Sequence, residues 1–162
     1  DMAVRQYIKF DGVEGESRSR DHKGEIEVLS WHWGLTNAVP SGGSGAGGGG
    51  AGRAHPSDLR FMHVFDKASP LLARAGAGGT HFKEVVLSAR KSGEGQKDFL
   101  KITMKEVFIT SVQWSSAESE GPVEEVAVAP RHFAVEYSPQ DSKGSLGASV
   151  RFSWDIAANV VK

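Results

Sequence analysis

The residues that could carry chemistry in this chain are a glycine tract, six histidines and several carboxylate clusters. Residues 45–50 read GAGGGG and match the G-x-G-x-x-G pattern of dinucleotide-binding loops. Such a loop needs a helix directly after it, because the helix N-terminus meets the phosphate. Here the tract runs into Arg53, His55 and Pro56 and then a strand-like segment. We therefore interpret it as a hairpin loop and expect no cofactor.

The histidines and carboxylates do not predict a catalytic or metal site. The histidines lack the helical i, i+4 spacing of zinc proteases, and no cysteine supports them, so we expect surface or packing roles for His22, His32, His55, His63, His81 and His132. A metal site assembled from distant strands stays open as an alternative. The acidic residues at 14–16, 25–27 and 118–125 lie in turns or alternate with apolar residues, which favours solvated surface over paired acid–base groups. We predict no catalytic residue.

Composition bounds the class of protein. The chain has 162 residues, 39% of them hydrophobic and 24% charged, which fits one soluble domain over residues 1–162. A formal net charge of −1 and the lack of a basic stripe argue against nucleic-acid binding. No segment has the roughly 20 apolar residues of a membrane helix, and the N-terminus lacks the apolar core of a signal peptide. We expect neither membrane insertion nor a cleaved signal.

Alternation of apolar and polar residues with period two predicts many short strands. The expected strands are residues 4–10, 25–33, 58–65, 81–90, 99–114, 124–137 and 150–156. Ser69 followed by Pro70 predicts the start of one short helix, which we expect to end at Gly76. Pro130 predicts an edge or an irregularity in its strand. The sequence thus predicts a mainly β fold: an antiparallel barrel with one short α-helix and an extended glycine-rich loop.

The apolar side of each strand should fill the interior of this barrel. In the last strand, the side expected inside carries Val150, Phe152, Trp154 and Ile156. The four tryptophans are expected to anchor the core or an interface: Trp31, Trp33, Trp114 and Trp154.

Several segments, in this order and spacing, resemble the Hcp family, the haemolysin-coregulated proteins of bacterial type VI secretion. Residues 7–34 end in Trp31-His32-Trp33-Gly34 and precede the glycine loop. The segment FDKASP at residues 65–70 opens the helix, ARKSG closes the following strand, and VEYSPQ and FSWDIAANV match the last two strands. The resemblance covers nearly the whole chain.

The resemblance implies a subunit without enzymatic activity that forms a ring of six, with rings stacked into a tube. It further implies, as partners, other copies of the chain, a VgrG-type spike, a contractile sheath and effector proteins held in the lumen. Assembly would take place in the bacterial cytoplasm, before secretion without a cleaved signal peptide.

Two groups of residues are candidate sites in such a ring. If Trp31 and Trp33 point into the barrel, Ser30 and His32 point out, and we predict that they face the lumen. An ordinary surface or core role for His32 stays open. The glycine loop is predicted to contact a neighbouring subunit or ring through Ser41, Gly42, Gly43, Ser44, Gly45, Gly47, Gly48, Gly49, Gly50 and Arg53.

Three other functions remain as alternatives from the sequence. A phage tail-tube protein would share the architecture. A small barrel enzyme could build its site from distant strands, and a carbohydrate-binding module could use exposed tryptophans.

Overall fold

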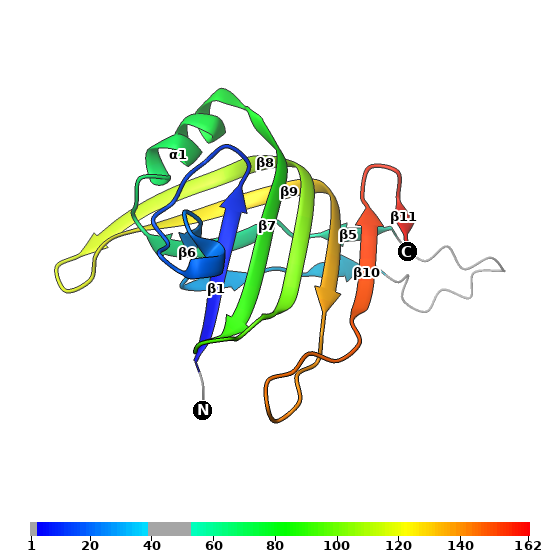
Figure 1. The fold of residues 1–162 in the computed structure, drawn as a ribbon. Coiled ribbons are helices and arrows are strands. Elements are labelled where there is room, and N and C mark those ends of the chain that lie inside the picture. The colour runs from blue at the N-terminus through cyan, green and yellow to red at the C-terminus, as the bar shows by residue number, and fades with distance from the viewer. Residues whose placement is uncertain (1–2, 39–52) are drawn as a thin grey trace, which may run out of the picture.

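A computed structural model describes residues 3–38 and 53–162 and shows a mainly β fold with one α-helix in that part of the chain (Figure 1). The helix α1 spans Ser69–Gly78, and a short 3-10 helix, η1, spans Arg20–His22. The strands are β1 Val4–Phe10, β2 Ile26–Glu27, β3 Ser30–His32, β4 Leu35–Asn37, β5 Ala54–Pro56, β6 Leu59–Val64, β7 His81–Lys91, β8 Asp98–Ala117, β9 Gly121–Tyr137, β10 Val150–Asp155 and β11 Val160–Val161. The predicted fold class is confirmed.

One antiparallel sheet curls so that β1 and β6 come to lie on either side of one short strand segment. Its order is β11-β10-β9-β8-β7-β1-β2, and β6 also pairs with β9 while β3 pairs with β6. The segment of residues 26–32 bridges β1 and β6, because β2 lies on β1 and β3 lies on β6. Between β2 and β3, the Val28 amide donates to the Gln6 carbonyl and the Leu29 amide to the Met62 carbonyl. The curled sheet is therefore bridged by a strand segment that changes partners, and one continuous ladder does not close it.

The core lies inside this curl, where alternate residues of each strand meet. Fully or almost fully buried side chains on the inner side include Ile8, Phe10, Leu59, Phe61, Val85, Leu87, Ile102, Met104, Val126, Phe133 and Trp154. Each large apolar side chain that leaves water contributes about 1.5–3 kcal/mol. The expected inner side of the last strand holds for Trp154, and Phe152 and Ile156 pack against the core. The prediction is wrong for Val150, which is 69% exposed because it pairs with Tyr137 at the open end of the sheet.

The helix α1 ends two residues later than predicted. Gly76 lies inside it, where an added Cβ would be 3.1 Å from Cγ2 of Ile109 on β8, so this glycine lets the helix approach the sheet closely. The helix stops at Gly79, which has a left-handed φ of 70°. At the start, Ser69 is already helical, and Asp66 accepts a hydrogen bond from the Ala68 amide at 2.9 Å.

Pro130 marks the predicted irregularity within β9. Residues 123–128 of β9 pair with β6, and residues 132–137 pair with β10. Pro130 lies between these two segments, opposite Val107 of β8. A residue without an N–H is tolerated there because neither β6 nor β10 needs its donor.

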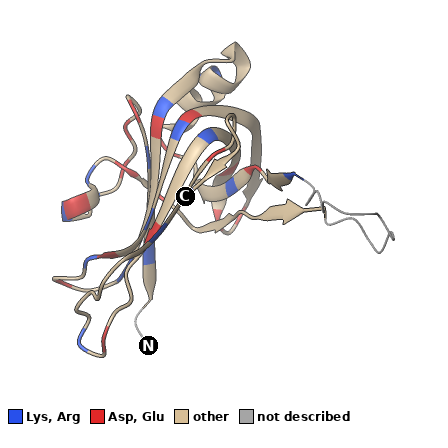
Figure 2. Cartoon of the chain, turned by 90° about the vertical axis from the view of Figure 1, so that its right-hand side faces the viewer, with Lys and Arg blue, Asp and Glu red and all other residues tan. Residues whose placement is uncertain are grey.

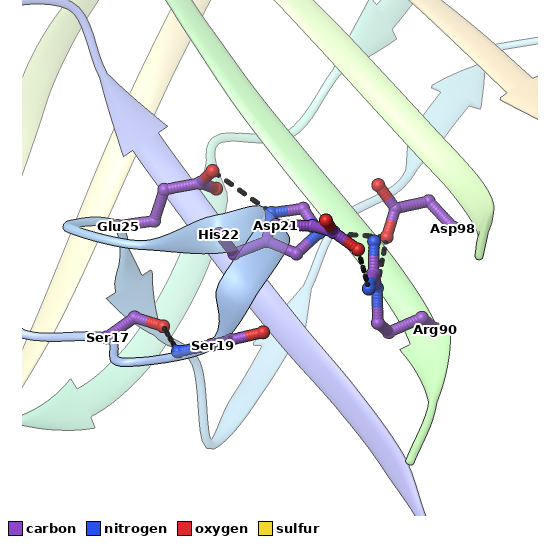
Figure 3. A network of polar contacts seen from close by, with 7 residues as sticks. All are labelled: Ser17, Ser19, Asp21, His22, Glu25, Arg90 and Asp98. Atoms are coloured by element: carbon purple, nitrogen blue, oxygen red, sulfur yellow. Dashed lines mark hydrogen bonds and ion pairs between the residues drawn. The ribbon is translucent and has the colours of Figure 1, made fainter. Parts of the chain in front are cut away.

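The loop of residues 11–25 is fastened to the sheet by a charged network around His22 (Figure 3). The His22 ring stacks on Tyr7 with centroids 4.3 Å apart, and its Nδ1 and Nε2 lie 3.0 Å from Glu25 Oε2 and 2.9 Å from Asp98 Oδ1. Arg90 donates to the same Asp98 oxygen and to Asp21. With a carboxylate at each ring nitrogen, the imidazole is held in its doubly protonated form.

These contacts change the acidity of the groups involved. Burial by itself would lower the pKa of His22, but the hydrogen bonds to Asp98 and Glu25 outweigh it and raise that pKa to about 9. Burial opposes ionisation of Asp98 as well, yet His22 and Arg90 lower its pKa overall. At neutral pH the network therefore contains a charged imidazolium, a guanidinium and their carboxylate partners.

The network predicts that the free energy of unfolding falls as pH rises from about 6.5 to about 9. The folded chain holds the His22 proton over this window and the unfolded chain releases it, so the stabilisation is full below about pH 6.5 and is lost as pH passes the folded pKa. The expected loss is ~1–3 kcal/mol. Urea unfolding at several pH values measures it, with the protein kept in one oligomeric state.

The variant His22→Gln should abolish this pH dependence while keeping hydrogen-bonding capacity. His55→Gln, at an exposed histidine of β5, is the matched control for the loss of a histidine. An unchanged slope in His22→Gln would contradict the assignment.

Candidate assembly surfaces

The predicted lumen residues lie on an outward face formed by β3 and β6. In the register of these strands, Trp31 is opposite the buried Phe61 and packs against the core. Ser30 and His32, on the alternate side, are exposed. The tryptophans thus point inward and these two residues point outward, as the conditional prediction requires.

The surroundings of Ser30 and His32 are mostly polar and balanced in charge. Ser30 is opposite the half-buried Met62, and His32 is opposite Arg60. The guanidinium of Arg60 lies 3.4 Å from a carboxylate oxygen of Glu125 on β9. We call these five residues the β3–β6 face. It is a polar wall with one partly buried apolar side chain.

Trp31 and Trp33 are fixed by contacts on both their polar and apolar sides. The Trp31 indole donates to the Gln6 side chain at 2.5 Å, and that of Trp33 donates to the Ser57 carbonyl at 2.6 Å. The Trp33 ring lies 4.4 Å from the Phe133 ring, between centroids. Trp31 is thus tied to β1, and Trp33, directly after β3, packs on β9, which agrees with an anchoring role.

The predicted contact residues 41–50 of the glycine tract lie outside the described residues, and Arg53 is exposed just before β5. On either side of the tract, β4 and β5 pair antiparallel, with Leu35 opposite Pro56 and Asn37 opposite Ala54. The strands β4 and β5 thus pair as the two arms of a hairpin. The strand β5 follows the tract directly, where a dinucleotide loop would need a helix.

A buried, hydrogen-bonded pair of histidine and glutamate lies at the base of the long β8–β9 hairpin. Glu124 and His63 are each 0% exposed, and Glu124 Oε1 lies 2.7 Å from His63 Nε2. The other Glu124 oxygen accepts a hydrogen bond from the Trp114 indole at 2.6 Å. The prediction that the whole acidic cluster at 118–125 is solvated is therefore wrong for Glu124. Glu124 shares its side of the strand with Val126 and Val128, and His63 shares its side with Leu59 and Phe61. The period of two could therefore have placed both inside.

The same site contains a second carboxylate. Asp66 Oδ2 lies 3.9 Å from His63 Nδ1, a buried nitrogen that makes no hydrogen bond among the described residues. Burial is the main cause that raises the pKa of Asp66, against the opposing effect of His63. His63 and Glu124 are enclosed by protein, whereas Asp66 lines a cavity at the surface.

Trp114 is held at its polar end and left free at its apolar face. The side chain is 59% exposed and meets Phe65 edge to face, with centroids 5.7 Å apart. It also borders a cavity of about 340 Å³ between α1 and β8. An exposed indole with its N–H tied to a buried carboxylate is typical of a contact residue for another macromolecule.

The described residues offer neither a metal-binding cluster nor a membrane-spanning helix. No group of three His, Asp or Glu side chains is arranged to hold a metal ion in residues 3–38 and 53–162. No helix in this part of the chain is long and apolar enough to span a membrane.

Comparison with known proteins identifies the family. Residues 7–137 match the family model described as type VI secretion system effector, Hcp. The chain is 39% identical over 162 residues to protein hcp1 of Pseudomonas aeruginosa, covering 98% of this chain and 99% of that protein.

Solved structures agree with this match. A structure described as a type six secretion system protein has a TM-score of 0.91 at 34% identity and covers 99% of this chain and 100% of that one. Hcp1 from Salmonella typhimurium has a TM-score of 0.81 at 29% identity, with coverage of 99% and 100%. The family match covers most of the chain, and the relatives match it end to end; the chain therefore belongs to the Hcp family of type VI secretion proteins.

Proposed function

We propose that six copies of this chain close into a ring and that the rings stack into the inner tube of a type VI secretion system. The observation that carries this proposal is the end-to-end match to Hcp proteins, at 39% identity over 98% of the chain. Hcp proteins are structural and secreted. The family match also favours a secretion tube over the phage tail tube, the small enzyme and the sugar-binding module considered from the sequence.

The fold supports a structural role over a catalytic one. Two of its histidine–carboxylate groups are engaged within the protein, one fastening a loop and the other placing Trp114, and a third, His81 with Glu106, is an exposed surface pair. We propose that the subunit assembles in the bacterial cytoplasm, where a contractile sheath surrounds the tube and a VgrG-type spike caps it. It is then exported without a cleaved signal peptide, with effector proteins in the lumen.

Within the ring, we propose that the β3–β6 face lines the lumen. A wall that receives varied cargo must be polar enough to release it, and the paired charges of Arg60 and Glu125 meet this requirement. Ser30 and His32 are its exposed polar groups. We propose residues 41–53, including Arg53, as the loop that contacts the next ring.

The purified protein is predicted to have the mass of a hexamer in solution. Six copies of the 17.3 kDa chain give about 104 kDa, a closed cyclic assembly. Light scattering measures the mass, and negative-stain images of the same sample should show rings. A monomer at high concentration would overturn the proposed function.

The substitution His32→Ala is predicted to leave the ring intact and to lower effector retention. Loss of a contact worth about 1 kcal/mol corresponds to roughly a fivefold weaker interaction. The measurement is the amount of effector that co-purifies per ring, with His55→Ala as the control at an exposed histidine outside this face. If His32→Ala retains effector and assembles as the parent does, the lumen assignment is wrong.

Deletion of residues 42–52 is predicted to leave single rings and to reduce tube formation. Ordering backbone against a neighbour costs about 1–2 kcal/mol per residue, so a glycine-rich contact loop must gain that much from the stack. Electron microscopy at high protein concentration compares tube length with that of the parent. Tubes of normal length would show that the loop is only a connection between β4 and β5.

A further inference from the structure

Resting on the ring proposed above, we propose that neighbouring subunits join through two unlike flanks, the hairpin arm of one subunit seating on the β10–β11 side of the next. The arm is the part of β8 and β9 within residues 110–125. The arm flank is the arm together with Leu29, Val64 and Phe65. The strand flank is β10 and β11 together with Tyr137 and Lys162.

Large exposed hydrophobic side chains gather on both flanks. On the arm flank, Leu29, Val64 and Phe65 line one cavity, and Phe65 contacts Trp114. On the strand flank, Tyr137 is directly opposite Val150, and β11 adds Val160 and Val161. Figure 1 shows the arm and the β10–β11 pair on opposite sides of the curled sheet. Two separate apolar patches on opposite sides are what a head-to-tail contact requires.

The tip of the arm is acidic, and the strand flank presents exposed cations. Residues 110–125 contain four glutamates and neither lysine nor arginine. Glu124 is buried and Glu125 meets Arg60, which leaves the exposed Glu118 and Glu120 at the tip of the arm.

The strand flank, which faces the viewer in Figure 2, has exposed Arg151 and Lys162. They line a cavity of about 390 Å³ with Asp155, whose carboxylate accepts a hydrogen bond from the Ala158 amide. The strand flank is mixed in charge, because Arg151 is opposite Glu136 in the ladder and Asp155 lies in the same cavity. Its exposed cations, Arg151 and Lys162, can meet the acidic tip of the arm, whereas two arm tips would repel each other.

Trp114 gives the arm flank a rigid centre. The chain of contacts from His63 to Glu124 to the indole N–H fixes the direction of the ring before any partner arrives. Immobilising a free side chain on binding costs conformational entropy, and a ring that is already fixed avoids most of this loss. Tryptophan is also enriched among residues that dominate binding energies.

Unlike flanks make the contact heterologous, and a heterologous contact closes into a ring when the rotation per subunit divides a full turn. The proposed occupant of the strand flank is thus a second copy of this chain. The free energy of the contact would come from the apolar patches and its direction from the charges.

Charge reversal tests the pairing. The double variants E118K/E120K and R151E/K162E each place like charges against each other at every subunit contact of a ring. Each is expected to raise the concentration at which half of the rings dissociate by at least about tenfold. Mass photometry over a dilution series measures this, and circular dichroism checks the fold. The control K83E/K97E has the same change in charge as R151E/K162E but uses exposed lysines outside both flanks.

Mixing the two variants is the decisive step. The reversed arm of one variant then meets the reversed strand flank of the other, so the mixture should recover rings in which the variants alternate, three copies of each. Trp114→Ala should weaken the ring similarly, with Leu71→Ala on α1 as the control at another exposed apolar residue.

Two results would overturn this pairing and leave the proposed ring intact. One is that both double variants keep their rings on dilution as the parent protein does. The other is that a mixture of two ring-deficient variants fails to recover rings. A parent protein that forms no ring would instead overturn the proposed function itself.

Discussion

The long pairing of β8 with β9 is the constraint on which the rest of the structure depends. It runs antiparallel from Leu100 opposite Tyr137 to Ala117 opposite Gly121, far longer than an ordinary strand pair. A ladder of this length cannot stay in one flat sheet, and β9 exchanges β6 for β10 on either side of Pro130. β8 and β9 therefore belong to two parts of the curled sheet, one that includes β6 and one that includes β7 and β10. Their hairpin end forms the arm.

The buried pair of Glu124 and His63 needs a reason other than stability. Removing polar groups from water costs free energy even when they bond to each other, and well-packed apolar residues at such positions are often as stable or more so. What an apolar pair would not provide is an acceptor for the Trp114 indole, which Glu124 supplies at 2.6 Å. We infer that the pair is retained for the orientation it gives to an exposed ring.

Sequence patterns predicted elements well where one periodicity ran without interruption. The strand at residues 4–10 appears with the expected bounds, because each of its residues has a ladder partner on β7. The predicted strand at 25–33 is broken into β2 and β3, since its first part belongs to β1 and its last part to β6. Period two cannot report such a change of partner. Likewise, the residue type of Gly76 predicts a helix stop, but this glycine lies inside the helix because Ile109 packs closely against it. A contact between residues so far apart in the chain cannot be predicted from the local sequence.

The candidate sites divide in the same way. Ser30 and His32 were placed outward correctly, because the large indoles of the neighbouring residues determine the inner side of a strand. Glu124 was placed wrongly, since a cluster of glutamates looks solvated until its partner, 61 residues away in the chain, is known. The arm flank could not be read from sequence at all, because Leu29, Phe65 and Trp114 come from separate strands and loops.

A subunit that must be soluble alone and cohesive in an assembly faces opposing demands. This chain has no cysteine, so every subunit contact has to be non-covalent. Gathering all exposed apolar surface in one patch would let any two copies meet face to face and stop there. The proposed pairing divides it between two flanks, and the acidic arm tip would then favour the cations of the strand flank over a second arm. Under that arrangement a row of joined copies keeps one free flank at each end. Growth ends only when the last subunit contacts the first.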